Sequence, residues 1–425
     1  MNYKELKEYI DSNDIDELLK KIICSDDIKD EKKRYHLLLD QLYPNNENGD
    51  FHFVSSPGRV EIGGNHTDHQ HGHVVAATIS YDNVCVFTKS NDTRIVYSDP
   101  KLGTVDIDIK DTSYKKEEEN TSASIIRGIA NRLKELGYKV GGFRAVCDSR
   151  VLIGSSLSSS ACFEVMIVEI FSYLYNESKI NVVERALISQ YSENKYFGKA
   201  CGLLDQSTIS AGGFVTIDFK NPENPTIESF DFSFDKYGYD FFVVDTKGTH
   251  ANLSNDYSAM PLECKSVAKE LGKEVLADTN IDDFYKNIRS IRDNLNNDRA
   301  LLRALHFYGE DERAIKQKEA IKNKDIDTLL KLMNESGRSS YMYLQNVNLP
   351  SNVKTQNIAL GLSATDLFLK GKGAFRIQGG GFEGTFMAIV PSDLSNSYIE
   401  LMNRLYGDGS VIMAKIRPFG TKIII

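Results

Sequence analysis

Two stretches of the chain combine polar side chains with small residues in patterns that suit the recognition of phosphates or hydroxyl groups. The first, SSPGRVEIGGNHTD at positions 55–68, places Arg59 after a Pro-Gly pair and places Asn65, His66 and Asp68 after two glycines. Glycines let a backbone approach a ligand closely or adopt a positive φ. We expect the Pro-Gly pair to end a strand and turn the chain. The alternative interpretation of the whole stretch is a plain polar hairpin loop.

The second stretch, LIGSSLSSSA at positions 152–161, leads into a strongly apolar run at 161–175. That run predicts a buried helix, and the free N–H groups at a helix N-terminus bind anions. Simple N-capping by Ser158 is the alternative. Six small residues exceed what one cap needs, so the pattern favours a phosphate loop, although it lacks the Walker A spacing.

Two weaker signals lie further along the chain. The segment CGLLDQ at 201–206 follows Glu193, and an acid such as Asp205 in small and apolar surroundings could act as a general base. The segment GGGFEG at 379–384 is either a flexible hairpin or a backbone surface that packs against the phosphate loop. Alone, neither segment identifies a function.

Half of the eight histidines lie within eight residues, which raises the question of a metal site. His69, His71 and His73 alternate, so on a strand they would share one face, as zinc ligands can. No cysteine and no second histidine pair joins them in the sequence. The residues alone leave two interpretations, a metal site or the wall of a pocket for another ligand.

The periodicity of apolar residues predicts both helices and strands around these segments. The predicted helices lie within 1–43 and at 123–136, 161–175, 302–321 and 328–336, and the predicted strands at 51–55, 74–79, 84–88, 94–98, 142–147, 241–245 and 385–390. Their mixture indicates an α+β chain. Its 425 residues suggest two lobes, with a seam near residue 235.

Composition excludes several classes of protein. The formal net charge of −9 argues against binding to nucleic acid, which requires a basic face. No apolar run approaches the roughly 18 residues that a membrane span needs. The six cysteines are scattered without a CxxC pair, and the charged N-terminus is unlike a signal peptide. We therefore expect a cytoplasmic protein, and nothing in the sequence implies a protein partner.

Taken together and in this order, the motifs resemble those of the galactokinases, a branch of the GHMP small-molecule kinases. The resemblance runs from about residue 53 to near the C-terminus. It is carried by PGRV at 57–60 with HTD at 66–68, by LSSSA at 157–161, by Glu193-Asn194 with CG at 201–202 and DQ at 205–206, by SNDY at 254–257, by His306, Glu310, Arg313 and MNES at 333–336, and by 379–384.

The resemblance implies a two-lobed GHMP kinase fold with an N-terminal mixed-sheet domain, 1–235, a C-terminal α+β domain, 236–425, and the active site between them. It also implies residue roles. Asp205 would take the proton from the anomeric hydroxyl of the sugar and Arg59 would lie beside it, while Glu193 and a serine, Ser160 above all, would hold Mg²⁺. The other implied roles are sugar binding by Asn65, His66, Asp68, Gly202 and Tyr257, and ATP binding by Gly154, Ser155, Ser156, Leu157, Ser158, Ser159, Ser160 and Ala161.

The chain departs from the family pattern where the sugar would bind. EIGGNH at 61–66 stands where relatives have NLIGEH, so Asn65 replaces a glutamate that meets the sugar near C6. A carboxylate there would repel a C6 carboxylate, whereas an amide can donate or accept a hydrogen bond. His69 replaces a tyrosine, Ser155 and Ser156 replace glycines, and Gln378 replaces a threonine. An arginine is also missing after Tyr257.

The leading interpretation is an ATP-dependent kinase that makes galactose 1-phosphate. An anomeric kinase for another sugar, galacturonate above all, is the alternative that Asn65 suggests. A non-catalytic sensor of galactose and ATP is a third, although the intact 157–161 motif speaks against it. A GHMP kinase for mevalonate-like or homoserine substrates is disfavoured by HTD at 66–68.

Overall fold

The first half of the protein is built on a large mixed sheet. The computed structural model describes the chain except residues 47–48, 102, 152–155, 200, 249–252 and 383. The sheet runs in the order β12-β1-β2-β5-β3-β4, with β6 paired to β2 and β7 to β6. Its strands are β1 Phe51–Gly63, β2 His73–Lys89, β3 Arg94–Asp99, β4 Gly103–Asp108, β5 Phe143–Ser149, β6 Phe214–Asp218, β7 Thr226–Phe230 and β12 Lys422–Ile423.

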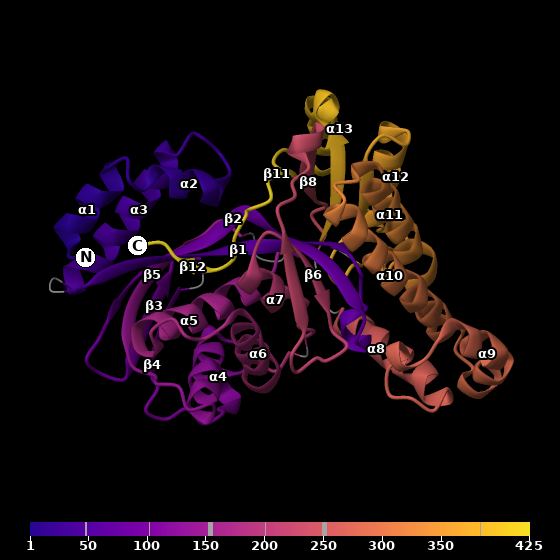
Figure 1. Cartoon of the computed structure of the whole chain (residues 1–425), viewed down its shortest axis with the longest axis horizontal. Coiled ribbons are helices and arrows are strands. Elements are labelled where there is room, and N and C mark those ends of the chain that lie inside the picture. Colours follow the sequence, from indigo (N-terminus) through magenta and orange to yellow (C-terminus); the bar gives the residue numbers. More distant parts are fainter. Residues whose placement is uncertain (47–48, 102, 152–155, 200, 249–252, 383) are drawn as a thin grey trace.

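Helices cover both faces of this sheet (Figure 1). One face carries the three N-terminal helices, α1 Tyr3–Asp11, α2 Asp16–Ile23 and α3 Lys29–Leu42, and the other carries α4 Ser122–Glu135, α5 Ser159–Asn176, α6 Val182–Ser192 and α7 Leu204–Ala211. Helix α5 is buried along most of its length because nearly all of its first fourteen residues face other elements. The apolar run at 161–175 predicted this helix correctly.

The second half contains a smaller antiparallel sheet in the order β11-β8-β10-β9. Its strands are β8 Tyr239–Asp245, β9 Ala374–Ile377, β10 Thr385–Pro391 and β11 Val411–Ala414, and its helices are α8 Ser254–Glu270, α9 Ile281–Leu295, α10 Asp298–Lys322, α11 Ile326–Ser339, α12 Asn357–Leu369 and α13 Ser395–Tyr406. The α+β class expected from the sequence is therefore confirmed.

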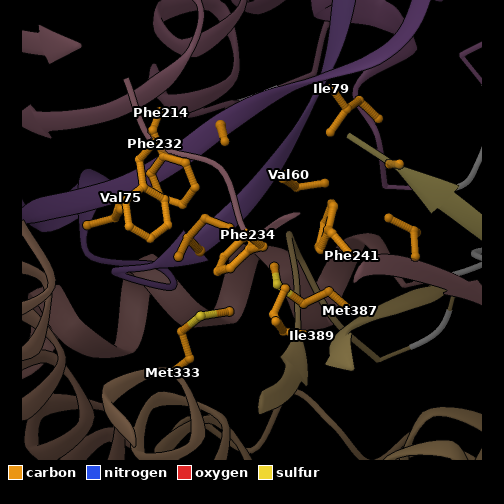
Figure 2. Close-up of a cluster of buried hydrophobic side chains, with 14 of the residues drawn as sticks. Val60, Val75, Ile79, Phe214, Phe232, Phe234, Phe241, Met333, Met387 and Ile389 are labelled. Atoms are coloured by element: carbon orange, nitrogen blue, oxygen red, sulfur yellow. The ribbon is translucent and has the colours of Figure 1, made fainter. Parts of the chain in front are cut away.

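A shared apolar core joins the two sheets. Val60, Val75 and Ile79 of the first sheet lie in one buried cluster with Met387 and Ile389 of the second (Figure 2). The chain also returns at its end, because β12 pairs with β1. The change from one sheet to the other falls between β7 and β8, and a boundary near residue 235 stays a prediction.

Two strand predictions were wrong in an instructive way. Pro57 and Gly58 do not turn the chain, because β1 continues through them, with a shift in its pairing to β2 between Pro57 and Arg59. The strands predicted at 74–79 and 84–88 form one strand, β2.

In the part of the chain that the structure describes, no helix is long and apolar enough to cross a membrane.

Candidate functional site

Two side chains from distant parts of the sequence meet at the carboxylate of a third residue. Arg59 on β1 places its Nε 2.6 Å from Oδ1 of Asp205, which lies in the first turn of α7. The hydroxyl of Ser158, just before α5, donates a hydrogen bond to Oδ2 of the same residue. We call Arg59, Ser158 and Asp205 the transfer triad. It gives the carboxylate a fixed orientation and a cationic neighbour.

The bulge in β1 explains how Arg59 reaches this position. The backbone N–H of Arg59 donates to the carbonyl of Leu157 at 3.2 Å, at the point where the pairing of β1 with β2 shifts. Its guanidinium also donates to the carbonyl of Ser156. Arg59 is therefore tied to the 156–158 segment through both backbone and side chain, and it is almost fully buried.

The serine-rich segment before α5 has an unusual backbone. Ser156 and Ser158 both have positive φ, 54° and 60°. Ser158 makes no side-chain cap on α5, so simple N-capping by this residue was the wrong interpretation. Leu157 and Ala161 are buried, whereas Ser159 and Ser160 face a cavity. Two predicted ATP-binding residues, Gly154 and Ser155, lie outside the described residues.

The glycine segment at 379–384 packs onto the serine segment, as one of the two interpretations predicted. A Cβ added at Gly379 would lie 3.5 Å from Cβ of Ser156 and 3.9 Å from a guanidinium nitrogen of Arg59. Ring atoms of Tyr257 lie against Gly380, where a Cβ would come within 2.3 Å of them. The backbone at Gly379 thus lies beside Arg59 of the transfer triad.

A cavity of about 220 Å³ opens beside the start of α5. Ser159, Ser160, Glu164 and Glu193 line one part of it. The residues that line the remainder are Asn83, Tyr97, Asp99, Lys101, Asn120, Ser122, Ile125, Ser149, Phe163 and Phe197. A helix N-terminus, hydroxyls and a lysine at one cavity can accommodate a phosphate-bearing ligand.

Glu164 belongs to this site, although the sequence analysis did not single it out. The side-chain nitrogen of Gln206 donates to Oε2 of Glu164 and to Oε2 of Glu193, at 3.0 Å in each case. Lys199 lies 3.1 Å from Oε1 of Glu193. A signal was available, since Glu164 is an acid inside the otherwise apolar run at 161–175.

These oxygens fit a divalent cation such as Mg²⁺. Within the described residues, Oε1 of fully buried Glu164 has no hydrogen-bond partner. Burial and the neighbouring Glu193 raise the pKa of Glu164 well above its usual range, so a cation bound beside the two carboxylates would favour their ionised forms. Two carboxylates and the Ser160 hydroxyl supply the hard oxygen ligands that Mg²⁺ prefers.

The predicted sugar-binding residues at 64–68, which we call the sugar loop, follow β1 directly. Asn65 is buried, and its side chain is occupied by protein partners: Nδ2 donates to the carbonyl of Gly379 at 2.9 Å, and Oδ1 accepts from Nδ2 of Asn346 at 2.9 Å. The expected contact of Asn65 with a sugar therefore competes with two hydrogen bonds inside the protein. Asn346 was not identified from the sequence.

His66 and Asp68 each lie against a glycine, Gly380 and Gly202 respectively. His66 has a φ of 60°, and its Nε2 lies 3.4 Å from the carbonyl of Gly380. A Cβ at Gly202 would lie 1.8 Å from Oδ2 of Asp68, so only glycine leaves room for this carboxylate. The hydroxyl of Tyr257 donates to the carbonyl of Gly381 at 3.1 Å.

Burial shifts the pKa values of both loop side chains. It lowers the pKa of His66 to about 4, so the imidazole is neutral near pH 7. Burial, with a further contribution from Asp205, raises the pKa of Asp68 to about 6. The loop thus presents a neutral imidazole and a carboxylate that ionises just below neutral pH, and both can pair with sugar hydroxyls.

The histidines do not share a strand face, contrary to the sequence prediction. His69 lies in a short 3-10 helix, Asp68–Gln70, and His71 follows it with a φ of 61°. Only His73 belongs to β2, and its Nδ1 lies 3.0 Å from Asp311. Among the residues that the structure describes, no three His, Cys, Asp or Glu side chains are grouped to hold a metal ion.

Comparison with known proteins identifies both halves of this site. Residues 41–89 match the galactokinase galactose-binding signature, and residues 124–213 match the GHMP kinases N-terminal domain. A galactokinase of Clostridium acetobutylicum is 28% identical over 363 residues, which are 83% of this chain and 88% of that protein. One of Glaesserella parasuis is 29% identical over 367 residues, 84% of this chain and 88% of the relative.

Solved structures show the same fold. The Lactococcus lactis galactokinase complexed with galactose superposes with a TM-score of 0.77 at 21% identity, covering 90% of this chain and 98% of that one. The Methanococcus jannaschii mevalonate kinase gives 0.61 at 16% identity, covering 87% and 99%. The resemblance drawn from the motifs and the expected GHMP kinase fold are both confirmed.

Proposed function

We propose that this chain, which carries the galactokinase signature on a GHMP kinase fold, transfers a phosphoryl group from ATP to the anomeric hydroxyl of galactose, giving galactose 1-phosphate. The protein would then be a sugar 1-kinase. The relatives that share over four fifths of its length are named galactokinases, and the solved structure with a TM-score of 0.77 was determined with galactose. The 41–89 match falls on the segment that contains the sugar loop.

The observation that carries the proposal is the carboxylate of Asp205, held by two donors between the serine segment and the sugar loop. Its neighbours are Arg59 at 2.6 Å and the hydroxyl of Ser158. Asp68 lies close enough for Asp205 to raise its pKa. A general base needs this position, with the sugar on one side and the phosphate on the other.

The chemistry of the transfer requires little beyond positioning and charge. Each oxygen of Asp205 keeps a lone pair that can accept the proton of the anomeric hydroxyl. Arg59 pairs with this carboxylate and would offset negative charge that develops as the phosphoryl group moves. Backbone N–H groups at the start of α5 and the hydroxyls of Ser159 and Ser160 would bind the phosphates.

Mg²⁺ is part of the proposal. Glu193 and Ser160, joined by Glu164, would hold it beside the phosphates. Bound Mg²⁺ offsets phosphate charge and orients the transferred group. Gln206 keeps the two glutamates together, and Lys199 neutralises Glu193 when no cation is bound.

The contacts of Asn65 bear on the galacturonate alternative. That alternative assumed an amide free to meet C6 of the sugar, yet both ends of the amide bind Gly379 and Asn346. The relatives give it no support either. The transfer triad argues against a sensor without turnover, because a protein that only binds galactose and ATP has no evident use for it.

The experiment is ATP turnover with Mg²⁺ against galactose, glucose, galactosamine, arabinose and galacturonate. Activity highest on galactose supports the proposal. Activity confined to galacturonate would overturn the choice of sugar, and absence of turnover on every sugar, despite binding of galactose and ATP, would indicate a sensor.

A cytoplasmic location is also proposed. All six cysteines are unpaired, and four of them are buried. Reduced thiols persist where glutathione and thioredoxin keep the compartment reducing. The only partners that the site requires are the sugar and ATP.

A further inference from the structure

Two buried side chains of helix α10 form hydrogen bonds with the backbone of the sugar loop. Oε1 of Glu310 accepts hydrogen bonds from the N–H groups of Gly64 at 2.9 Å and Asn65 at 3.3 Å. One helical turn earlier, Nε2 of His306 donates to the carbonyl of Asn65 at 2.9 Å. Residues four apart lie on one face of a helix, so α10 holds both backbone groups of Asn65 from the same side.

Glu310 makes these bonds as a charged group. It is fully buried, which alone would raise its pKa, but the positive charges of Arg313 and Arg376 and the hydrogen bond from Ser336 outweigh burial and lower the pKa to about 2. Nε of Arg313 donates to Oε2 at 2.9 Å, and the hydroxyl of Ser336 donates to Oε1. Hydrogen bonds to an ionised acceptor are stronger than those between neutral groups.

His306 is fixed in turn by α11. Its Nδ1 lies 2.8 Å from the hydroxyl of Ser339, and burial lowers its pKa, so the ring is neutral. A neutral ring that donates from Nε2 to the carbonyl of Asn65 must accept at Nδ1, which Ser339 satisfies. We call Glu310 and His306, with their bonds to the backbone of the sugar loop, the clamp. Through Ser339 the clamp connects α11 and α10 to the sugar loop.

Asn65, which the clamp holds, directly precedes His66, a predicted sugar-binding residue. His66 adopts a φ of 60°, a conformation that is uncommon for a residue other than glycine. Such a backbone persists only where the surroundings impose it. The side chain of Asn65 is held as well, by Gly379 and Asn346, so the residue before His66 is fixed at four points.

We propose that Glu310 and His306 are positioning residues for the sugar: by clamping the Asn65 peptide they set where His66 and Asp68 meet the substrate. This inference rests on the proposed function for the identity of the sugar, though not for the clamp itself. Their contacts with the loop are to its backbone, so they act through the loop and not on the reacting atoms.

The test compares Glu310→Gln with Glu312→Gln. Both change a glutamate on α10 to its amide, but the Glu312 side chain is 67% exposed and pairs with Lys316 on its own helix. We expect Glu310→Gln to raise the galactose KM by roughly tenfold or more, with the ATP KM changed by less than about twofold. Glu312→Gln should change neither.

Hydrogen–deuterium exchange supplies a readout that needs no substrate. Glu310→Gln should speed amide exchange in a peptide covering 62–73, while the peptide covering 156–165 keeps its wild-type rate. His306→Gln, whose amide can still reach the carbonyl of Asn65, should lie between wild type and His306→Ala in both exchange and galactose KM. It also carries the test if Glu310→Gln is recovered unfolded.

The outcomes separate the clamp from the proposed function. Equal rises in the galactose and ATP KM values, or unchanged exchange at 62–73, would overturn the positioning role. A wild-type protein without galactose turnover would overturn the proposed function alone, because exchange at 62–73 would still report on the clamp.

Discussion

The transfer triad and the sugar loop are held by different kinds of contact. In the triad, the Arg59 and Ser158 side chains bind the Asp205 side chain directly, and all three residues belong to the first sheet and its helices. In the sugar loop, Glu310 and His306 from the second half bind the backbone. The triad thus fixes a charge, whereas the clamp fixes the shape of a loop.

Because the two regions are held by different contacts, we expect that substitutions can alter catalysis and sugar recognition separately. A change in the triad should lower kcat and leave sugar binding intact, since the interaction is needed in the transition state. A change around the loop should weaken sugar binding first. Four substitutions or conditions test this separation.

The largest effect is expected from Asp205→Asn. The amide keeps the shape of the side chain but cannot accept the proton, so kcat should fall by roughly 10²–10⁴-fold. The galactose dissociation constant, measured by calorimetry, should change little. The surface variant Asp366→Asn is the control, and a substantial loss of galactose affinity in Asp205→Asn would show that the two regions are not separable.

Gly202→Ala should act on the sugar side. The new Cβ would lie 1.8 Å from Oδ2 of Asp68, so the carboxylate must move. We expect the galactose KM to rise by roughly 10- to 100-fold, since a displacement of about 1 Å in a positioned group can have that effect. Gly309→Ala on α10, where a Cβ meets nothing closer than 3.4 Å, is the matched control. An unchanged galactose KM would remove Asp68 from the sugar site.

Glu164→Gln tests the proposed Mg²⁺ site beside the transfer triad. It keeps the bond to Gln206 but removes one carboxylate, so the Mg²⁺ concentration for half-maximal activity should rise roughly tenfold. Binding of Mn²⁺ followed by electron paramagnetic resonance should weaken in parallel. Glu177→Gln, just beyond the exposed end of α5, should behave as wild type. Equal Mn²⁺ affinity in the two variants would exclude Glu164 from the cation site.

The smallest effect is a pH dependence of sugar binding. The pKa of Asp68 is raised to about 6, so the group is a carboxylate at pH 7 and largely protonated at pH 5. Protonation removes an acceptor for sugar hydroxyls, and the galactose dissociation constant should rise severalfold, by less than about tenfold, between pH 7 and pH 5. Asp68→Asn should bind weakly with a flat profile. A flat profile in the wild type would contradict this account of the loop.

The sequence predicted much of the chemistry because that chemistry depends on residue types. Arg59, Ser158 and Asp205 were all named before their contacts were known. The serine run before an apolar helix was a signal in the residues themselves, whereas the roles of Arg59 and Asp205 came from the resemblance to the galactokinases. The apolar run at 161–175 likewise predicted α5. The two lobes and the serine that holds Mg²⁺ remain predictions.

What the sequence could not supply was backbone geometry. The Pro-Gly pair at 57–58 suggested a turn, but the strand continues through it with a shift in its pairing, and the N–H of Arg59 donates to Leu157. The alternating histidines suggested a strand, yet a 3-10 turn begins at Asp68. Asn346 gave no signal because its role depends on Asn65, 281 residues away.

The central claim is that the anomeric hydroxyl of galactose receives the phosphoryl group through Asp205. Galactose labelled with ¹³C at C1 should be incubated with ATP and Mg²⁺, with the wild type and Asp205→Asn side by side. The account predicts phosphorus coupling at the labelled carbon with the wild type and almost none with the variant. Phosphate at another carbon, or equal product from both proteins, would contradict it.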